Sequence, residues 1–217
     1  LRKKGIIVNY SSKVSNDTVF EGPCKVAEYS FFSGSLGVGS YIGKNTKLKA
    51  KVGRFTSIAC NVTCVNGVHP YKLPFVSTSP CFYSNACQAG FTFSKEQKRE
   101  ELRFADTEKK YPLIVGNDCW ICEGVTFIAG VTVHDGAVIM SHALVTKDVP
   151  AYAIVAGLPA KVIGYRYDDE TISFLKEIKW WDKSIEWLDT HHELMCDMQK
   201  LKNYMLKLIK AKMEKFQ

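Results

Sequence analysis

The sequence predicts an all-β solenoid, a parallel β-helix whose short strands stack in successive coils, with an inserted loop and an α-helical tail. Three observations predict this fold: apolar residues recur at every sixth position, turn-forming residues stand between them, and the spacing becomes helical after Tyr167. We expect the solenoid domain over residues 1–167, the inserted loop over about residues 66–112, and the helical extension over residues 168–217.

The clearest repeat begins at Val115. Every sixth residue from there is apolar, and four places after each stands a second small or apolar residue. Because an amphipathic helix would repeat at three and four, this period indicates strands and corners instead. We expect three units, or 18 residues, in each coil, with neighbouring coils about 4.8 Å apart. The first series is Val115, Ile121, Phe127, Val133, Ile139 and Val145, and the second is Cys119, Val125, Val131, Ala137, Ala143 and Val149.

An earlier stretch repeats less regularly. Its apolar residues are also six apart, but their phase shifts once, between Leu48 and Val52. Phe20 and Val26 belong to a rougher first coil, as expected of a solenoid end that acts as a cap. The regular positions are Leu36, Ile42 and Leu48, then Val52, Ile58 and Cys64.

Between the two arrays lies a long interruption, from about Asn66 to Pro112. Its first half is rich in aromatic residues and prolines, and its second half is charged from Lys95 to Glu101. A loop of this length inside a compact domain is usually functional.

After Tyr167 the pattern is helical. Asp168 and Asp169 are suited to cap a first helix, and Asp182 to cap a second one. The lysines of the tail are interpreted as a solvated helix face, since no zinc-finger, helix-turn-helix or RNA-binding pattern accompanies them. We therefore expect no nucleic-acid partner.

The composition favours an anionic ligand, because the formal net charge is +7. No stretch approaches the roughly 18 apolar residues of a membrane span. The apolar segment Gly5–Val8 is too short for the core of a signal peptide. We therefore expect a cytoplasmic protein without an integral membrane segment, whose eight cysteines are free thiols.

Four segments, in order, resemble one known family. Residues 115–121, 145–150 and 156–163 are similar to three motifs of the hexapeptide-repeat acetyltransferases. Residues 52–58, followed by Asn66-Gly67-Val68-His69-Pro70, resemble the branch that holds chloramphenicol, streptogramin and polysaccharide O-acetyltransferases. Cys122 and His134 depart from the pattern, since each stands at a repeat corner where glycine is common.

The resemblance implies a left-handed β-helix, a homotrimer with active sites between subunits, and direct transfer of acetyl from acetyl-CoA to a hydroxyl. No metal cofactor is implied. The acceptor is expected to be a sugar of a bacterial surface polysaccharide such as capsule or O-antigen. The alternatives are an antibiotic-inactivating acetyltransferase of the chloramphenicol or streptogramin type and a catalytically inactive solenoid scaffold.

His69 is the candidate general base. An acceptor hydroxyl needs a base that works near pH 7, and an imidazole suits that task. His69 lies in the interruption directly after a coil, and the family's catalytic histidine stands at the matching position. The remaining histidines, His134, His142, His191 and His192, do not form a spaced metal set, which argues against a carbonic anhydrase on the same fold.

The other site residues follow from the resemblance. Trp120, expected at a repeat corner, matches a tryptophan of the acceptor cleft, and Asn66, Phe82 and Tyr83 are expected beside it. The acetyl-CoA groove is expected to include Ala129, Ser141, Thr146, Lys147 and Lys161. Cys119 and Cys122 formally read as a C-x-x-C pair, but their repeat positions favour a structural role.

Overall fold

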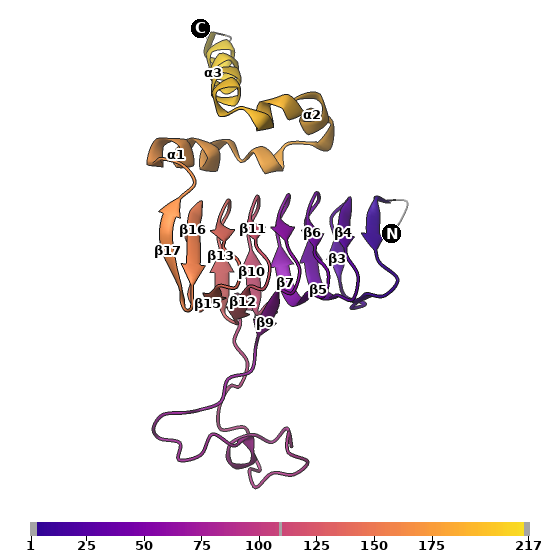
Figure 1. Ribbon diagram of the computed structural model, residues 1–217, viewed down its shortest axis with the longest axis vertical. Helices are drawn as coiled ribbons and strands as arrows, with labels where there is room; N and C mark the ends of the chain where they lie inside the picture. The colour runs from indigo at the N-terminus through magenta and orange to yellow at the C-terminus, as the bar shows by residue number, and fades with distance from the viewer. Residues whose placement is uncertain (1–3, 109, 215–217) are drawn as a thin grey trace. The chain divides into compact units, whose positions relative to one another are not determined.

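The computed structural model of the chain describes residues 4–108 and 110–214 (Figure 1). These residues form two compact units, Leu1–Ile172 and Ser173–Gln217. The first unit is a parallel β-solenoid, which confirms the predicted fold class, and the second is helical.

Two sheets form the solenoid within the described residues. Their strands pair in parallel with those of neighbouring coils, except for a final antiparallel hairpin. The eight-stranded sheet contains β1 (Ile6–Val8), β4 (Cys24–Val26), β6 (Tyr41–Ile42), β8 (Ser57–Ile58), β11 (Trp120–Ile121), β14 (Val138–Ile139), β16 (Ala153–Gly157) and β17 (Ala160–Tyr165). The nine-stranded sheet contains β2 (Lys13–Val14), β3 (Val19–Phe20), β5 (Phe31–Leu36), β7 (Lys47–Val52), β9 (Thr63–Val65), β10 (Leu113–Val115), β12 (Thr126–Ile128), β13 (Val131–Val133) and β15 (Leu144–Val145).

The strand register gives two coil lengths. Val115 pairs with Val133, so this coil has the predicted 18 residues. Leu36 pairs with Val52, so the coil before it has 16 residues, and the prediction of 18 is wrong there. The reason is a corner that β5 and β7 cross as continuous six-residue strands. Later coils build the same corner from two separate strands, such as β12 and β13. The phase shift between Leu48 and Val52 marks the shorter corner.

The core consists of the residues that the six-residue period selects. Each residue of both series between Val115 and Val149 is at most 2% exposed, which confirms the predicted inward rows. In the first array Phe20, in the less regular first coil, and Cys64, directly before the insertion, are only partly buried. These side chains stack from coil to coil and form one continuous apolar core.

Buried hydroxyl groups join successive coils at one corner. The Thr56 hydroxyl donates to the carbonyl oxygen of Gly116 at 2.7 Å and accepts from the Cys119 amide at 3.2 Å. Ser40 makes the matching pair of bonds one coil earlier, to Gly53 and Thr56. Backbone groups at this corner are therefore satisfied although no water reaches them.

The helical unit begins with α1 (Asp169–Ile178), whose first turn is capped as predicted by the Asp168 carboxylate, which accepts from the Thr171 amide at 2.8 Å. The predicted cap at Asp182 is wrong, because Ser184 caps α2 (Ile185–Thr190) and accepts from the Trp187 amide at 3.1 Å. A 3-10 segment, His192–Cys196, separates α2 from α3 (Met198–Glu214). Within the described part of the chain, no helix is both long enough and apolar enough to cross a bilayer.

Candidate active site

The insertion leaves the solenoid after β9, which ends at Val65, and returns at β10, which begins at Leu113 (Figure 1). Its two arms pair at the base. Gly67 and Leu102 form an antiparallel bridge, and the Val68 amide donates to the Glu101 carbonyl oxygen at 2.9 Å. The Asn66 side chain accepts from the Arg103 amide at 3.1 Å, so this predicted cleft residue holds the two arms together.

A small polar core orders the rest of the insertion. Glu101 accepts from the Ser84 hydroxyl at 2.7 Å and from the side-chain amides of Gln88 and Gln97 at 2.8 and 2.9 Å. Ser84 is fully buried, and so is the neighbouring Tyr83. The Glu101 carboxylate therefore joins three parts of the insertion by hydrogen bonds, and the three donors stabilise its negative charge.

His69 lies exposed on the insertion, and one edge of its ring is fixed. Its Nδ1 is 2.8 Å from the Thr78 carbonyl oxygen and 3.1 Å from the Tyr83 hydroxyl. Because a carbonyl oxygen only accepts, Nδ1 must carry the proton that is donated to it. Nε2 then holds a lone pair, and no residue within 4–108 and 110–214 makes a hydrogen bond to it. This tautomer is the one that can accept a proton from a substrate at Nε2.

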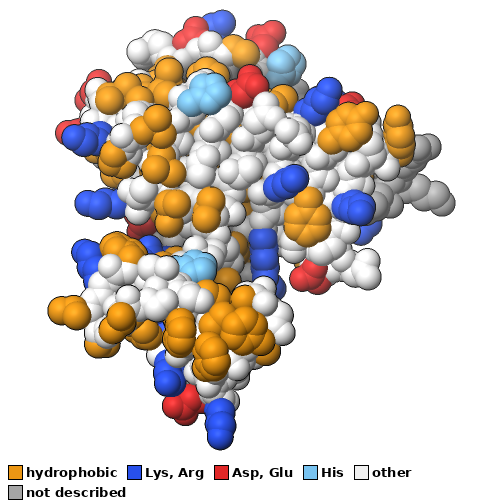
Figure 2. All heavy atoms as spheres, turned by 60° about the horizontal axis from the view of Figure 1, so that its bottom comes forward, with side chains coloured by type: hydrophobic (Ala, Val, Ile, Leu, Met, Phe, Trp, Pro, Cys, Tyr) orange, Lys and Arg blue, Asp and Glu red, His pale blue; other side chains and the backbone are white. Residues whose placement is uncertain are grey.

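Tyr83 does not form an open wall, contrary to the expectation for the acceptor cleft, because its side chain is buried and its hydroxyl turns toward His69. Phe82 is 53% exposed and stacks on Phe93, with ring centroids 5.4 Å apart. Phe91 meets Phe93 edge to face at 5.4 Å. Figure 2, which brings the insertion toward the viewer, shows hydrophobic side chains gathered on that side.

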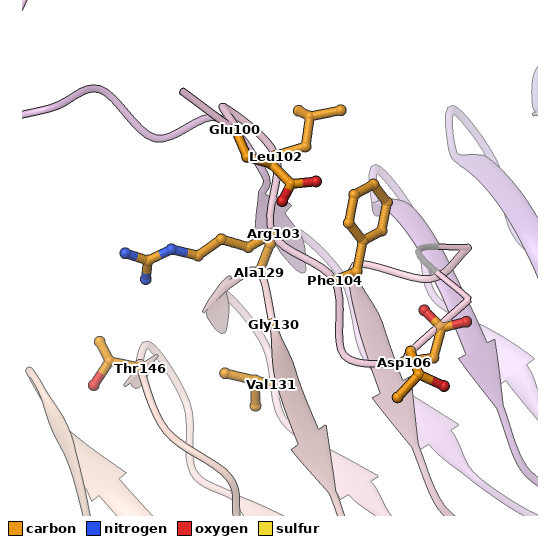
Figure 3. Close-up of a pocket in the computed structure, with 10 residues that line it drawn as sticks. Glu100, Leu102, Arg103, Phe104, Asp106, Ala129, Gly130, Val131 and Thr146 are labelled. Carbon is orange, nitrogen blue, oxygen red and sulfur yellow. The ribbon is translucent and has the colours of Figure 1, made fainter. Parts of the chain in front are cut away.

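A hollow of about 470 Å³ lies where the returning arm of the insertion passes two later coils (Figure 3). Ala129 and Thr146, both predicted for the acetyl-CoA groove, line it together. They meet the insertion because Ala129 and Gly130 occupy the corner that the insertion fills one coil earlier, between paired strands. The other lining residues are Glu100, Leu102, Arg103, Phe104, Asp106, Thr107 and Val131.

Arg103 is a candidate that sequence reasoning missed. Figure 3 shows its guanidinium extended to the side on which Thr146 lies, away from the carboxylates of Glu100 and Asp106. Within the described residues it forms no ion pair. Its charge is therefore available to an anion in the hollow. The sequence showed that the second half of the insertion is charged, but nothing in it indicated that Arg103 pairs with Asn66.

The remaining predicted groove residues lie outside the lining of this hollow. Lys147 follows Thr146 directly and is exposed. Ser141 is exposed on the corner after β14 and hydrogen-bonds Cys122. Burial raises the pKa of the Cys122 thiol, and the contact with Ser141 partly opposes this rise. Lys161 is exposed on β17, opposite Ala156 of β16.

Trp120 was expected at a repeat corner, but it lies on strand β11. It is 52% exposed, points outward, and pairs with Ser57 and Val138 of the adjacent coils. Its strand belongs to the eight-stranded sheet, whereas the insertion leaves the nine-stranded sheet. Within one chain the structure does not bring Trp120 and His69 together.

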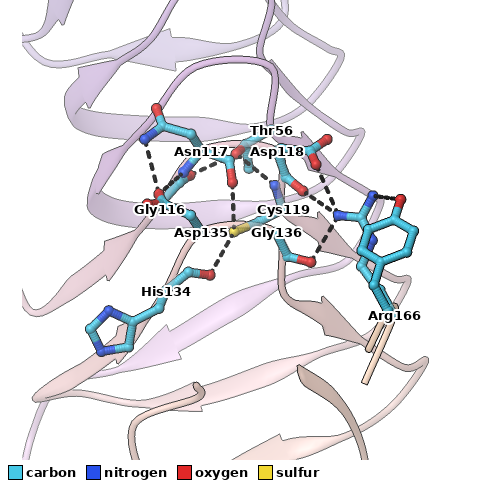
Figure 4. Close-up of polar contacts among 10 residues, drawn as sticks. Thr56, Gly116, Asn117, Asp118, Cys119, His134, Asp135, Gly136 and Arg166 are labelled. Carbon is cyan, nitrogen blue, oxygen red and sulfur yellow. Dashed lines mark hydrogen bonds and ion pairs between the residues drawn. The ribbon is translucent and has the colours of Figure 1, made fainter. Parts of the chain in front are cut away.

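Next to Trp120, a polar cluster joins the final hairpin to two corners (Figure 4). Arg166 forms an ion pair with Asp118 at 2.9 Å and donates to the Gly136 carbonyl oxygen at 2.9 Å. Burial raises the pKa of the Asp118 carboxyl, and Arg166 partly opposes this rise. Cys119 is buried beside the cluster, and burial raises its thiol pKa to about 12, so it is a structural thiol.

Comparisons with known proteins point to one enzyme class. No family model matches the chain. A chloramphenicol acetyltransferase of Klebsiella aerogenes is 31% identical over 200 residues, which cover 86% of this chain and 89% of that protein. One from Morganella morganii is 32% identical over 195 residues, or 86% of each chain. A galactoside O-acetyltransferase of Escherichia coli strain K12 is 35% identical over 79 residues, or 36% of this chain and 39% of that protein.

Among solved structures, a variant of AntD, an N-acyltransferase from Bacillus cereus in complex with dTDP and coenzyme A, gives a TM-score of 0.54. It is 12% identical and covers 80% of this chain and 89% of that one. At this identity the likeness concerns the fold alone.

Proposed function

The chain belongs to the hexapeptide-repeat acetyltransferases, which use acetyl-CoA, and on this premise we propose that it acetylates a hydroxyl of a chloramphenicol-type antibiotic. Relatives named for chloramphenicol match 86% of the chain, whereas the galactoside enzyme matches 36%. The expected sugar acceptor is therefore less well supported than the antibiotic alternative.

The surface of the insertion favours the same acceptor. Phe82, Phe91 and Phe93 are 53%, 53% and 69% exposed, and Phe82 and Phe91 both pack against Phe93. Such a cluster offers ring faces and edges to an aromatic ligand such as the nitrophenyl group of chloramphenicol.

The observation that carries the proposal is the orientation of His69. A proton donated from Nδ1 to the Thr78 carbonyl oxygen leaves Nε2 as the base. Nε2 then accepts the proton of the acceptor hydroxyl as its oxygen attacks, a contribution of about 10²–10⁴-fold in rate. Glu101 is committed to three donors of the insertion and is not assigned this role.

The hollow at the base of the insertion fits a part of acetyl-CoA. Arg103 offers a cation without a carboxylate partner in the described residues, and Ala129 and Thr146 form the facing wall. Ser141 and Lys147 lie on the same coil as Thr146, and Lys161 lies on the final hairpin. Together they would extend the groove toward the end of the solenoid. Acetyl-CoA, when bound, supplies an acetyl group that is already activated as a thioester, so no enzyme nucleophile is needed.

A homotrimer is part of the proposal. Outward residues of the eight-stranded sheet form a row in register that is largely apolar and partly exposed, with Ile7, Tyr41 and Trp120 at 58%, 40% and 52%. Burying such a row against a second copy would stabilise an assembly. Association would also bring Trp120 of one subunit to the insertion of another, which one chain does not achieve by itself.

The test is release of free thiol from acetyl-CoA with chloramphenicol and, separately, with a galactoside as acceptor. We expect kcat/KM to be higher with chloramphenicol, and the product to contain a base-labile ester. A higher kcat/KM with the galactoside would instead support a sugar hydroxyl as the acceptor. Absence of thiol release with either acceptor, together with no binding of acetyl-CoA, would favour the scaffold.

A further inference from the structure

We propose that Tyr83 is a positioning residue for His69, holding the imidazole so that Nε2 acts as the base. This inference rests on the proposed function and assigns to Tyr83 a role at the histidine rather than at the acceptor. The geometry that carries it is the triangle formed by His69 Nδ1, the Tyr83 hydroxyl and the Thr78 carbonyl oxygen.

The protons of this triangle have one consistent arrangement. Nδ1 donates to the Thr78 carbonyl oxygen at 2.8 Å, because that oxygen only accepts. The Tyr83 hydroxyl is 3.5 Å from the same carbonyl oxygen and donates to it. The lone pairs of the Tyr83 oxygen, which lies 3.1 Å from Nδ1, then face the Nδ1 proton. Two oxygens therefore surround the Nδ1 proton, and both stabilise the ring when Nε2 gains a second proton.

Tyr83 is buried, whereas His69 is exposed. Its side chain is 0% exposed, its amide donates to the Pro80 carbonyl oxygen, and its carbonyl oxygen accepts from the Lys98 amide at 2.8 Å. Phe75 packs edge-on against the Tyr83 ring at 5.8 Å. The Tyr83 ring in turn meets the imidazole edge-on, with centroids 6.4 Å apart. A buried ring thus orients an exposed one.

The Tyr83 hydroxyl keeps its proton at neutral pH, because its pKa is raised above the ordinary value of 10.0. Burial raises the pKa of Tyr83, the Glu101 carboxylate raises it further, and the Arg99 guanidinium opposes both effects. Arg99 also lies 5.9 Å from the centre of the Phe75 ring. With its proton retained, Tyr83 can donate to Thr78 and leave the Nδ1 proton in place.

The experiment compares Tyr83→Phe with Tyr71→Phe in the full-length chain. Tyr83→Phe keeps the buried ring and removes only the hydroxyl, while Tyr71 is 72% exposed and serves as the matched control. We expect Tyr83→Phe to lower kcat about three- to tenfold, the effect of one lost hydrogen bond. Both KM values should stay within about twofold. The acidic limb of the pH–rate profile should move to lower pH, and Tyr71→Phe should change none of these.

A second readout does not depend on activity. Nitrogen-15 shifts of the His69 ring should show Nδ1 protonated and Nε2 unprotonated in the wild type at neutral pH. In Tyr83→Phe the Thr78 carbonyl oxygen still accepts from Nδ1, so the ring should keep this tautomer, while the Nδ1 shift changes because the second oxygen is lost. An unchanged kcat, or a lower melting temperature with unchanged ring nitrogens and pH profile, would overturn the positioning role. So would a wild-type ring protonated at Nε2 alone, even if the variant failed to fold. A wild-type enzyme without acetyl transfer would refute the proposed function. The nitrogen-15 shifts would still test whether Tyr83 positions the His69 ring.

Discussion

At the scale of single residues, Arg103 supplies the positive charge among the residues that line the hollow. Its backbone amide donates to the Asn66 side chain at 3.1 Å, so the pairing of the two arms fixes the position of the Arg103 backbone. The side chain is exposed and extends beside Thr146 (Figure 3). A cation placed in this way can attract the phosphates of acetyl-CoA without any contact with the acceptor.

Arg103→Ala is therefore expected to raise the KM for acetyl-CoA about three- to tenfold, the range of a charge-assisted contact weakened by exposure. The KM for chloramphenicol and kcat should change less than about twofold. Steady-state kinetics with each substrate varied in turn measure this. Lys95→Ala, an exposed cation elsewhere on the insertion, is the matched control. Equal increases in both KM values would remove Arg103 from the groove.

The sequence could identify His69 but not its working tautomer. Thr78 and Tyr83 stand 9 and 14 residues later in a loop without periodicity, and the contacts depend on how that loop folds. The same limit applies to Arg103, which is 37 residues from the side chain that positions it. Ala129 and Thr146, which the motif resemblance grouped together, line one hollow because both lie on repeating coils, where sequence position determines spatial position.

At the scale of elements, Gly34 permits β5 to turn the corner without a break. Its φ is +123°, and a methyl group added to it would lie 2.1 Å from the Ala50 carbonyl oxygen of the next coil. Backbone of the neighbouring strand cannot yield to such an overlap, since the coils are hydrogen-bonded along their length. The short 16-residue coil therefore depends on a residue without a side chain.

Gly34→Ala is expected to destabilise the protein by more than about 3 kcal/mol, because strain and overlap act together. Thermal or denaturant unfolding monitors the loss. Gly164→Ala is the matched control, as nothing lies within 4 Å of its added methyl group. A variant at Gly34 as stable as wild type would mean that β5 and β7 are not continuous across the corner.

The final hairpin is held by the ion pair between Arg166 and Asp118. Arg166→Met is expected to cost at most about 3 kcal/mol at neutral pH, since a partly buried carboxylate then lacks its partner. The sign of the pH dependence follows. Burial already holds the pKa of Asp118 above its ordinary value of 3.8, and without Arg166 nothing in the pair opposes this rise. A raised pKa in the folded state means that stability falls as the pH rises from about 3.8 through that pKa.

Unfolding of Arg166→Met measured between pH 4 and pH 7 should therefore show stability recovered on acidification. The double variant Asp118→Asn with Arg166→Met should not show this recovery in the same window. A pH-independent loss in Arg166→Met would indicate that the lost contacts are those to Gly136 and the aromatic rings rather than the carboxylate.

At the scale of the whole molecule, the period of six predicted the solenoid and its inward rows, because a repeat imposes one environment on each position. It did not predict the 16-residue coils, since the period of six does not show which strands continue across a corner, as β5 and β7 do. It also could not place Trp120 near His69, and one chain does not do so. That juxtaposition belongs to the proposed trimer.

Mixed oligomers test this arrangement. His69→Ala and Trp120→Ala should each have low activity as pure proteins. Co-expressed in equal amounts, they should recover about one quarter of the wild-type activity, because one ordered pair of neighbours in four carries both intact residues. Light scattering should give the mass of a trimer. Absence of recovery from mixed trimers would show that Trp120 and His69 do not share a site across subunits.

The central claim is that His69 removes the proton from the acceptor hydroxyl. The most direct measurement is kcat of His69→Ala with acetyl-CoA and chloramphenicol, taken beside its thermal melt. Because His69 is exposed and lies outside the inward rows, the melting temperature should change little. The turnover should fall by about 10²–10⁴-fold, the usual contribution of a general base. A folded variant whose kcat stays within about tenfold of wild type would contradict the assignment.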